Sequence, residues 1–246
     1  MTEKQPLLSQ PKAEPSFPVM SLPPSTEGVP QGLEYLTQVD QLLVHQLVQI
    51  VQVLTGFETE NKYVIKNSMG QQVYYAAEMS DCCERQFCGP KRSFSMSIVD
   101  NLGREVIHLE RPFRCGGCLC PCSLNVLEVQ APAGTVIGYV NEKYTCFNPQ
   151  FHVSDATGSQ QMFIQGPCWY CKCCSDVDYQ ILNQENGVQV GTLTSQWSGF
   201  CQETFTGTGN FSVTFPMDLT WQMKATLLSA AFLVDFMYYE QNKKRK

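Results

Sequence analysis

The sequence predicts an all-β fold with one central helix, a closed antiparallel β-barrel of about twelve strands around a C-terminal hydrophobic helix. Three observations predict it. A turn unit rich in Asn, Asp and Gly recurs between runs of alternating apolar and polar residues. The antiparallel order that this repetition implies leaves two exposed sheet edges unless the sheet closes. One long run, Trp221 to Tyr239, is apolar over almost its whole circumference and must be surrounded by lipid or by protein.

Residues 1–31 are predicted to be a disordered leader, because they hold seven of the fourteen prolines and no periodic apolar pattern. Pro15 to Pro18 match the PxxP pattern that docks on SH3-type grooves, and a solvated tail with an incidental match is the alternative. Met1 to Gln10 lack the apolar segment of a signal peptide, so we expect the body of the chain in the cytosol.

The predicted barrel domain covers residues 32–240. Its first part, Gly32 to Leu54, is rich in Leu, Val and Ile at a spacing that suits both a helix and a buried strand. The density of β-branched residues from Val44 to Val53 favours a strand after a short helical start.

From Tyr63 onward, an alternating run leads to Asn or Asp, two further residues, a glycine and a second alternating run. Alternation with period two around such a turn is the signature of a β-hairpin. The unit occurs at Gly70 and Gly103, in looser form at Gly158 and Gly187, and with a different turn at Gly134. Five hairpins and their flanking strands predict a meander of about ten to twelve strands.

The predicted helix, Trp221 to Tyr239, could just cross a bilayer, since nineteen residues extend roughly 28 Å. Lys224 and Asp235 leave only ten uncharged residues between them, a length that fits a buried core helix better. A barrel of about twelve strands is too wide for its own side chains to fill, and an apolar helix would fill it. The alternative is a membrane anchor followed by the basic tail, residues 241–246, which contains Lys243, Lys244, Arg245 and Lys246.

The overall charge argues against a nucleic-acid binder. The net charge is -6, only 16% of residues are charged, and the last four residues are the one dense basic cluster. The sequence contains no nucleophile elbow, no phosphate-binding loop and no paired catalytic carboxylates, and its three histidines are scattered. We therefore expect no bond-making chemistry.

Thirteen cysteines, an odd number gathered in clusters, make a poor disulfide framework for a cytosolic protein. Cys115, Cys118, Cys120 and Cys122 are close enough to bind zinc, and Cys168 and Cys171 could supply a second pair of ligands. Clustered cysteines are also substrates for reversible palmitoylation, and two or more acyl chains give stable anchoring. The third possibility is that these cysteines are unmodified thiols, either buried or at the surface.

Several motifs together resemble the phospholipid scramblase family, over about Gln31 to Tyr239. They are GLEYLTQVDQLLVHQ, LTGFETENKY, the CCERQFCGP run, LERPFRCGGCLCPC, GPCWYCKCC, and FPMDL before the apolar helix. The resemblance implies a tubby-like barrel and calcium-triggered, ATP-independent, bidirectional movement of phospholipids between leaflets of the plasma membrane. It also implies that Cys118, Cys120 and Cys122 carry palmitoyl groups, with Cys115, Cys171, Cys173 and Cys174 as additional thiols. Leu119 and Ser123 stand where relatives often carry cysteine, so fewer chains can be attached.

The resemblance places a calcium loop at Gly207 to Asp218. Gly207 and Gly209 stand where such a loop needs oxygen ligands, which leaves Asn210 and Asp218 as candidates and predicts weak binding. A glycine turn that leads into a barrel strand is the alternative. The segment Gly191 to Trp197, to which the family resemblance attaches nuclear import, has no basic residue, so we do not expect import through it.

The sequence therefore supports two functions. The first is a lipid-moving barrel on the cytoplasmic face of the plasma membrane, held by its lipid anchor and C-terminal helix. The second is a lipid-anchored adaptor, or a regulator linked to transcription, that moves no lipid. We expect the helix to pack inside the barrel or to dip into the membrane with Lys243 to Lys246 in the cytosol, because a spanning helix would put these cations outside. The family resemblance itself implies a single-pass protein whose C-terminal helix spans the membrane, which would put this basic tail on the opposite side.

Overall fold

The computed structural model describes residues 18–47, 61–79, 92–113, 124–168, 176–196 and 210–239. Its elements follow the chain as α1 Glu34–Thr37, β1 Gln41–Leu47, β2 Lys62–Asn67, β3 Gln72–Met79, β4 Phe94–Asp100, β5 Glu105–Arg111, β6 Val126–Gln130, β7 Val136–Lys143, β8 Gln150–Asp155, β9 Gln160–Gln165, β10 Val177–Asn183, β11 Gln189–Gln196, β12 Asn210–Thr214, α5 Trp221–Val234 and the π-helical turn η3 Asp235–Tyr239.

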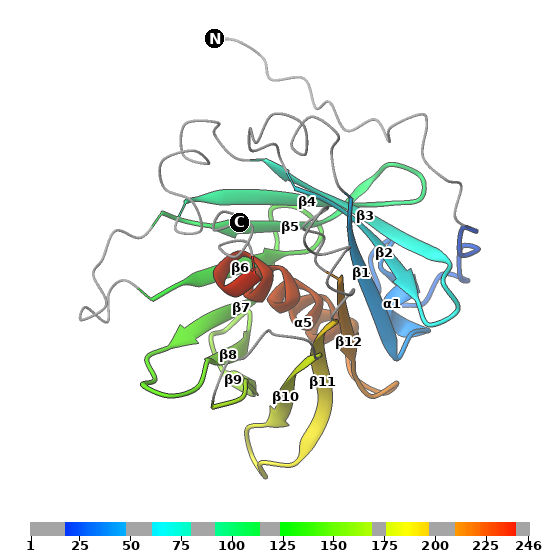
Figure 1. Cartoon of the computed structure of the whole chain (residues 1–246). Helices are drawn as coiled ribbons and strands as arrows, with labels where there is room; N and C mark the ends of the chain where they lie inside the picture. Colours follow the sequence, from blue (N-terminus) through cyan, green and yellow to red (C-terminus); the bar gives the residue numbers. More distant parts are fainter. Residues whose placement is uncertain are drawn as a thin grey trace.

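The twelve strands form one closed antiparallel barrel in which each strand pairs with its neighbours in sequence (Figure 1). The barrel closes at β1, where His45 lies opposite Val64 of β2 and Asn210 of β12. Closure gives every strand two partners, so no sheet edge is left open. The predicted fold class is confirmed.

The five predicted hairpins are the five tight turns of the barrel. In the β2–β3 turn the Asn67 side-chain oxygen accepts hydrogen bonds from the backbone N–H groups of Met69, at 3.1 Å, and Gln71, at 2.9 Å. Gly70 then adopts a φ of +77°, which glycine reaches without the clash that a Cβ would cause. The same pair of bonds recurs in two further turns, at Asp100 and Asp155.

A bulge accompanies each of these turns. The strand register shifts at Ile65/Lys66, Ile98/Val99, Val129/Gln130, Val153/Ser154 and Ile181/Leu182. A bulge bends the strand and increases its twist, and a sheet needs that curvature to close into a barrel. The turn sequences therefore act on the global shape as well as on the local reversal.

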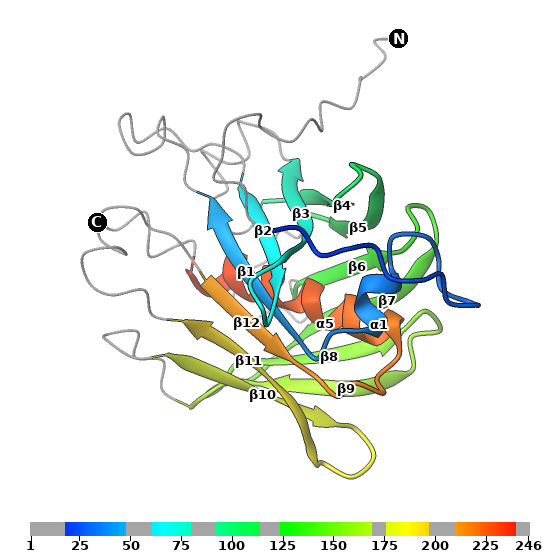
Figure 2. The same ribbon diagram turned by 90° about the vertical axis from the view of Figure 1, so that its right-hand side faces the viewer.

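The meander gives the barrel two different ends (Figure 2). The turn end carries the five tight turns and the connection from β12 to α5. The loop end carries the β7–β8 connection and the described chain positions next to the remaining connections, namely Leu47, Met79, Phe113, Cys168, Gln196 and Tyr239.

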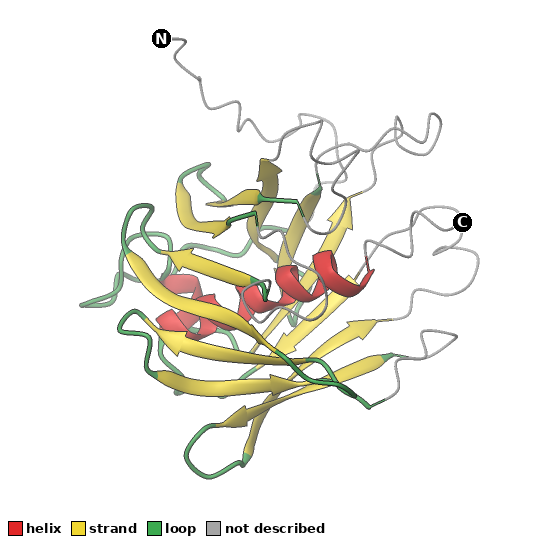
Figure 3. Cartoon of the chain, turned by 90° about the vertical axis from the view of Figure 1, so that its left-hand side faces the viewer, coloured by secondary structure: helices red, strands yellow, loops and turns green. Residues whose placement is uncertain are grey.

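Helix α5 enters at the turn end and runs through the barrel to the loop end (Figures 1 and 3). Thr220 caps its N-terminus by accepting a hydrogen bond from the Met223 N–H at 3.4 Å. Every residue from Met223 to Val234 is buried, as expected for a helix without a polar face. The predicted helix Trp221–Tyr239 is confirmed, with its last five residues in the π-helical turn. Within the described part of the chain, no helix combines the length and hydrophobicity needed to span a bilayer.

Gly138 lets α5 lie close to the barrel wall. A Cβ at this position would lie 2.8 Å from the Thr226 hydroxyl and 2.6 Å from the Ser154 carbonyl oxygen. Both separations are shorter than van der Waals contact allows, so a larger residue here would push the helix away from β7.

The N-terminal segment closes the turn end. Leu33, Tyr35 and Leu36 of the α1 region are buried over the start of α5. Further upstream, Gln72 donates its N–H to the Pro18 carbonyl at 2.8 Å and accepts from the Met20 N–H at 2.9 Å. Backbone contacts with the barrel are thus present at Pro18 and Met20, inside the segment 1–31 that is predicted to be a leader. These contacts are made by backbone groups, so the amino-acid composition on which the leader prediction rests does not reveal them.

Candidate functional site

The loop end is the part of the barrel to which the predicted anchor segments attach. Phe113 and Leu124, which flank the gap in the described chain that contains Cys115, Cys118, Cys120 and Cys122, both belong to this end. Cys168, which is exposed, precedes the gap that contains Cys171, Cys173 and Cys174. These seven cysteines and Lys243 to Lys246 lie outside the described residues. Because of the antiparallel order, the described residues that flank these segments all lie at one end of the barrel.

Lys224 lies fully buried at the turn end of α5. Its ammonium donates to the Val39 carbonyl at 2.8 Å and the Met217 carbonyl at 3.0 Å, and it lies 5.3 Å from the centre of the Phe215 ring. Burial lowers the pKa of Lys224, and the nearby carboxylates of Asp40 and Asp218 act in the opposite direction. These contacts fix the N-terminus of α5 to the segment before β1 and to the segment after β12.

Asp235 lies at the other end of the helix, in the π-helical turn. Its carboxylate accepts a hydrogen bond of 2.7 Å from the Tyr63 hydroxyl of β2 and is only 2% exposed. Lys224 and Asp235, the two charged residues of the predicted helix, therefore have separate partners at opposite ends of the barrel.

A buried ion pair lies at the same, loop end of the barrel. The Arg92 guanidinium contacts the Glu78 carboxylate through Nε and Nη2, each at 2.8 Å, and neither side chain is exposed. The other Glu78 oxygen accepts from the Asn61 backbone and side-chain nitrogens at 3.1 and 2.6 Å. Both carboxylate oxygens are thus occupied, which offsets the desolvation of a buried charge.

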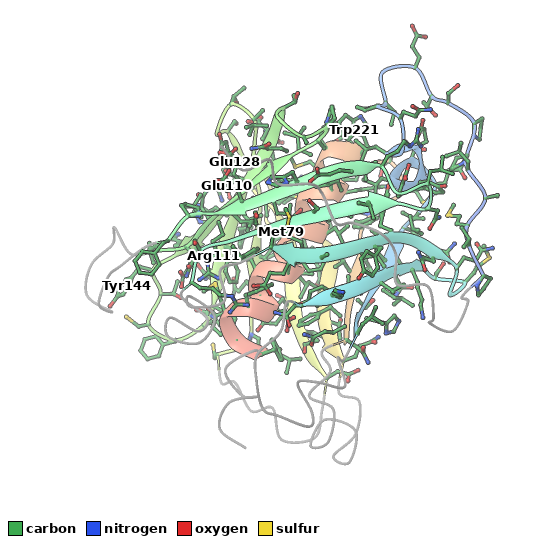
Figure 4. The ribbon with its side chains drawn as sticks, turned by 90° about the horizontal axis from the view of Figure 1, so that it is seen from above. Met79, Glu110, Arg111, Glu128, Tyr144 and Trp221 are labelled. Carbon is green, nitrogen blue, oxygen red and sulfur yellow. The ribbon has the colours of Figure 1, made fainter. Side chains whose placement is uncertain are left out.

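Arg92 and Arg111, at the loop end, also stack on aromatic rings. Arg92 lies 4.8 Å from the centre of the Phe236 ring, and Phe236 is stacked on Phe94 at 4.2 Å. Arg111, labelled in Figure 4, lies 5.5 Å from the Phe94 ring. Guanidinium–aromatic contacts of this kind are stronger when they are desolvated. The stack joins the last turn of the helix to β4 and β5.

Sequence reasoning missed Glu78, Arg92 and Arg111. Two of them were recoverable, because period-two alternation along β3 and β5 places Glu78 with the inward Tyr74 and Ala76, and Arg111 with the inward Ile107 and Leu109. That rule was applied to apolar residues only. Arg92 precedes β4 and carries no such signal.

The structure does not bring the two calcium candidates together. Asn210 begins β12 at the loop end, where its side-chain oxygen lies 3.1 Å from His45 Nδ1. Asp218 is exposed beyond the other end of the same strand. Gly207 and Gly209 lie outside the described residues, and within the described ranges no group of three His, Cys, Asp or Glu side chains could hold a metal. The loop ligands that the resemblance implied are therefore separated by an extended strand.

The histidines do not form a site among themselves. His45 lies on β1, His108 on β5 beside Glu105 at 2.8 Å, and His152 on β8. Burial lowers the pKa of His45 and of His152, which favours neutral imidazoles at neutral pH.

The fold and this end of the barrel define a class of protein, a closed barrel built around its own apolar C-terminal helix, with the residues that flank its cysteine-rich segments at one end. The chain belongs to the Scramblase family, whose model matches residues 20–241. It is 47% identical over 239 residues to phospholipid scramblase 1 of Mus musculus, covering 97% of this chain and 73% of that protein.

Two further relatives agree. Phospholipid scramblase 2 of Bos taurus is 46% identical over 241 residues, 98% of this chain and 82% of the relative. Phospholipid scramblase 1 of Homo sapiens is 48% identical over 223 residues, 91% of this chain and 70% of the relative. No solved structure matches the chain significantly.

Proposed function

We propose that this chain is a phospholipid scramblase, which moves phospholipids in both directions between leaflets without ATP and in response to calcium. The observation that carries the proposal is the 46–48% identity, over nearly the whole chain, to relatives named phospholipid scramblase. No bond is made or broken in such movement, in agreement with a sequence without a catalytic motif.

The barrel core bears on the route that lipid takes. Leu227, Leu228 and Phe232 of α5 are 0–1% exposed and pack inside the strands. A charged or zwitterionic headgroup crossing this apolar core would lose its hydration without gaining partners. In the proposal, lipid therefore moves along the outside of the barrel.

A lipid-anchored adaptor that moves no lipid is the second candidate. The same packed core favours it, because an adaptor needs a rigid barrel and no lipid path. Its partner would be a protein, and the PxxP match at Pro15 to Pro18 is one docking element for an SH3-type domain. Lipid exchange by the purified chain separates the two candidates.

Liposomes that contain the purified full chain and a fluorescent phospholipid should lose the protected, inner-leaflet fluorescence to an added membrane-impermeant quencher, without ATP. With calcium the loss should reach about half of the labelled lipid beyond that of protein-free vesicles, because bidirectional exchange equilibrates the leaflets. Exchange should begin only above about 10⁻⁵ M calcium, because Gly207 and Gly209 supply no side-chain ligand and Asn210 and Asp218 are poor substitutes. Vesicles that never exceed the protein-free control would exclude the scramblase and favour the adaptor.

We also propose that thioesters at Cys118, Cys120 and Cys122 hold the loop end against the cytoplasmic face of the plasma membrane, with Cys115, Cys171, Cys173 and Cys174 as further acceptors. Lys243, Lys244, Arg245 and Lys246 would add about 1 kcal/mol each next to anionic lipid. The described residues that flank these segments all lie at the loop end, which supports this arrangement.

Hydroxylamine, which cleaves thioesters, should release most of the cellular protein from the membrane fraction. Each lost acyl chain removes about 0.8 kcal/mol per buried methylene, which the basic tail alone does not replace. The triple replacement Cys118→Ser, Cys120→Ser, Cys122→Ser should match the effect without hydroxylamine, whereas Cys146→Ser, in the exposed β7–β8 connection, should not. A membrane pellet that keeps as much protein after both treatments as before them would refute the anchor.

A further inference from the structure

The loop end carries exposed aromatic side chains. Phe147 is 81% exposed, Tyr144 is 56% exposed and Phe113 is 49% exposed. The large apolar side chains exposed at the turn end, among the residues that the structure describes, are aliphatic, namely Val19, Leu22, Met69, Leu102, Val188 and Met217. Single exposed apolar residues are ordinary, but in the described chain all three exposed aromatic side chains lie at the same end of the barrel.

The β7–β8 connection holds Phe147 outward. The Thr145 hydroxyl donates to the Asn148 carbonyl across the bend, and the Gly166 N–H donates to the Pro149 carbonyl at 2.8 Å. Phe147 therefore projects from a hydrogen-bonded bend, and Tyr144 projects from the margin of the barrel in Figure 4. Because these bonds already hold the backbone of the bend, the backbone loses little conformational freedom when Phe147 binds.

The exposed charge beside Tyr144 is basic. Lys143 is exposed next to Tyr144, where an anionic lipid surface would attract it. The other exposed charges do not distinguish the two ends, because Asp176 is exposed at the loop end and Asp40 and Asp218 are exposed at the turn end.

The positions of the aromatic residues favour a flat partner. Phe113 follows β5, and Tyr144 and Phe147 lie between β7 and β8, with β6 between them in the barrel order. At about 4.8 Å between neighbouring strands, they are spread over roughly 10 Å or more of the rim. A rim of separate aromatic contacts fits the plane of a membrane better than the compact anchor of a protein interface.

We propose that the loop end docks directly on a phospholipid membrane, with Phe147 and Tyr144 inserted at the boundary between headgroups and acyl chains. Aromatic side chains of amphipathic segments occupy this boundary, and a lysine beside them can reach the phosphates. The inference rests on the proposed function and deepens it, because it names the surface that meets lipid in addition to the acyl chains. It also orients the barrel with α5 pointing its C-terminus at the membrane.

Sedimentation of the full chain with vesicles, after hydroxylamine has removed acyl groups, tests the surface. The vesicles contain phosphatidylcholine with phosphatidylserine. Phe147→Ala should lower the partition coefficient about tenfold, equivalent to about 1.4 kcal/mol. Phe147→Trp should restore binding, because Trp suits the same boundary. Met69→Ala is the matched control, since Met69 is 74% exposed at the turn end, and it should bind like the unaltered chain.

High salt distinguishes insertion of the aromatic side chains into the membrane from electrostatic attraction of the basic tail to the lipid. At about 1 M salt, where charge attraction is screened within about 3 Å, the tenfold ratio between the unaltered chain and Phe147→Ala should persist. Equal binding of the two would overturn the proposal and assign the aromatic rim to a protein partner. Equal losses in Phe147→Ala and Met69→Ala, or no measurable binding by the deacylated chain, would overturn it as well. Because this assay reads binding, a chain that passes it but exchanges no lipid would refute only the scramblase proposal.

Discussion

Replacing Glu78 with glutamine should lower the free energy of unfolding by about 3–5 kcal/mol, since it breaks a buried ion pair from one side. Arg92 would keep its buried charge while losing the carboxylate that both of its described polar contacts reach. The helix end should loosen with it, because the same guanidinium lies over Phe236. Denaturant unfolding of the full chain measures the change.

Two further variants, a surface control and a double variant, are needed to interpret this experiment. Glu110→Gln, on the exposed outer face of β5 (Figure 4), should change stability by no more than about 0.5 kcal/mol. The double variant Glu78→Gln, Arg92→Met should recover part of the loss, because it removes the second charge together with the first. A Glu78→Gln variant as stable as Glu110→Gln would show that the pair does not hold the loop end together.

Replacing Phe232 with alanine should also destabilise the barrel by about 3–5 kcal/mol, the usual range for a buried phenylalanine. Phe232 is 1% exposed in the middle of the barrel, and its ring meets the Tyr63 ring edge to face at 5.1 Å. Tyr63 also donates to Asp235, so the cavity would open beside a buried charge. Guanidinium unfolding in the absence of lipid and detergent measures the effect.

This second variant tests where the helix resides. If α5 left the barrel for a bilayer, the lipid-free barrel would not depend on Phe232. Leu102→Ala, 66% exposed in the β4–β5 turn, is the control and should change little. A loss below about 1 kcal/mol for Phe232→Ala, similar to the typical surface change, would contradict a helix packed in the core.

Much of the fold was predictable because its signals are local. Asn67 and Gly70 form their turn with neighbours only a few residues away, and alternation along β4 shows directly as Phe94, Met96 and Ile98. Neither depends on what lies across the barrel. The helix was equally visible, because its apolar circumference is a property of one segment.

The candidate site was less predictable because its contacts are distant in sequence. Tyr63 and Asp235 are separated by 172 positions, and Lys224 and Val39 by 185. The calcium candidates show the converse relation between sequence and space. Asn210 and Asp218 are close in sequence, but the intervening residues form β12, and an extended strand carries the two apart.

By itself, the sequence determined the order of strands and turns and the presence of one helix without a polar face, since short-range sterics, hydrogen bonds and hydrophobic periodicity specify both. Only the tertiary structure decided that strands, rather than lipid, surround that helix in the described chain, and which partners its buried charges find. The physical reason is closure. Pairing β1 with β12 creates the interior that shields Lys224 and Asp235 from water, and no local pattern encodes a contact between the two ends of a meander.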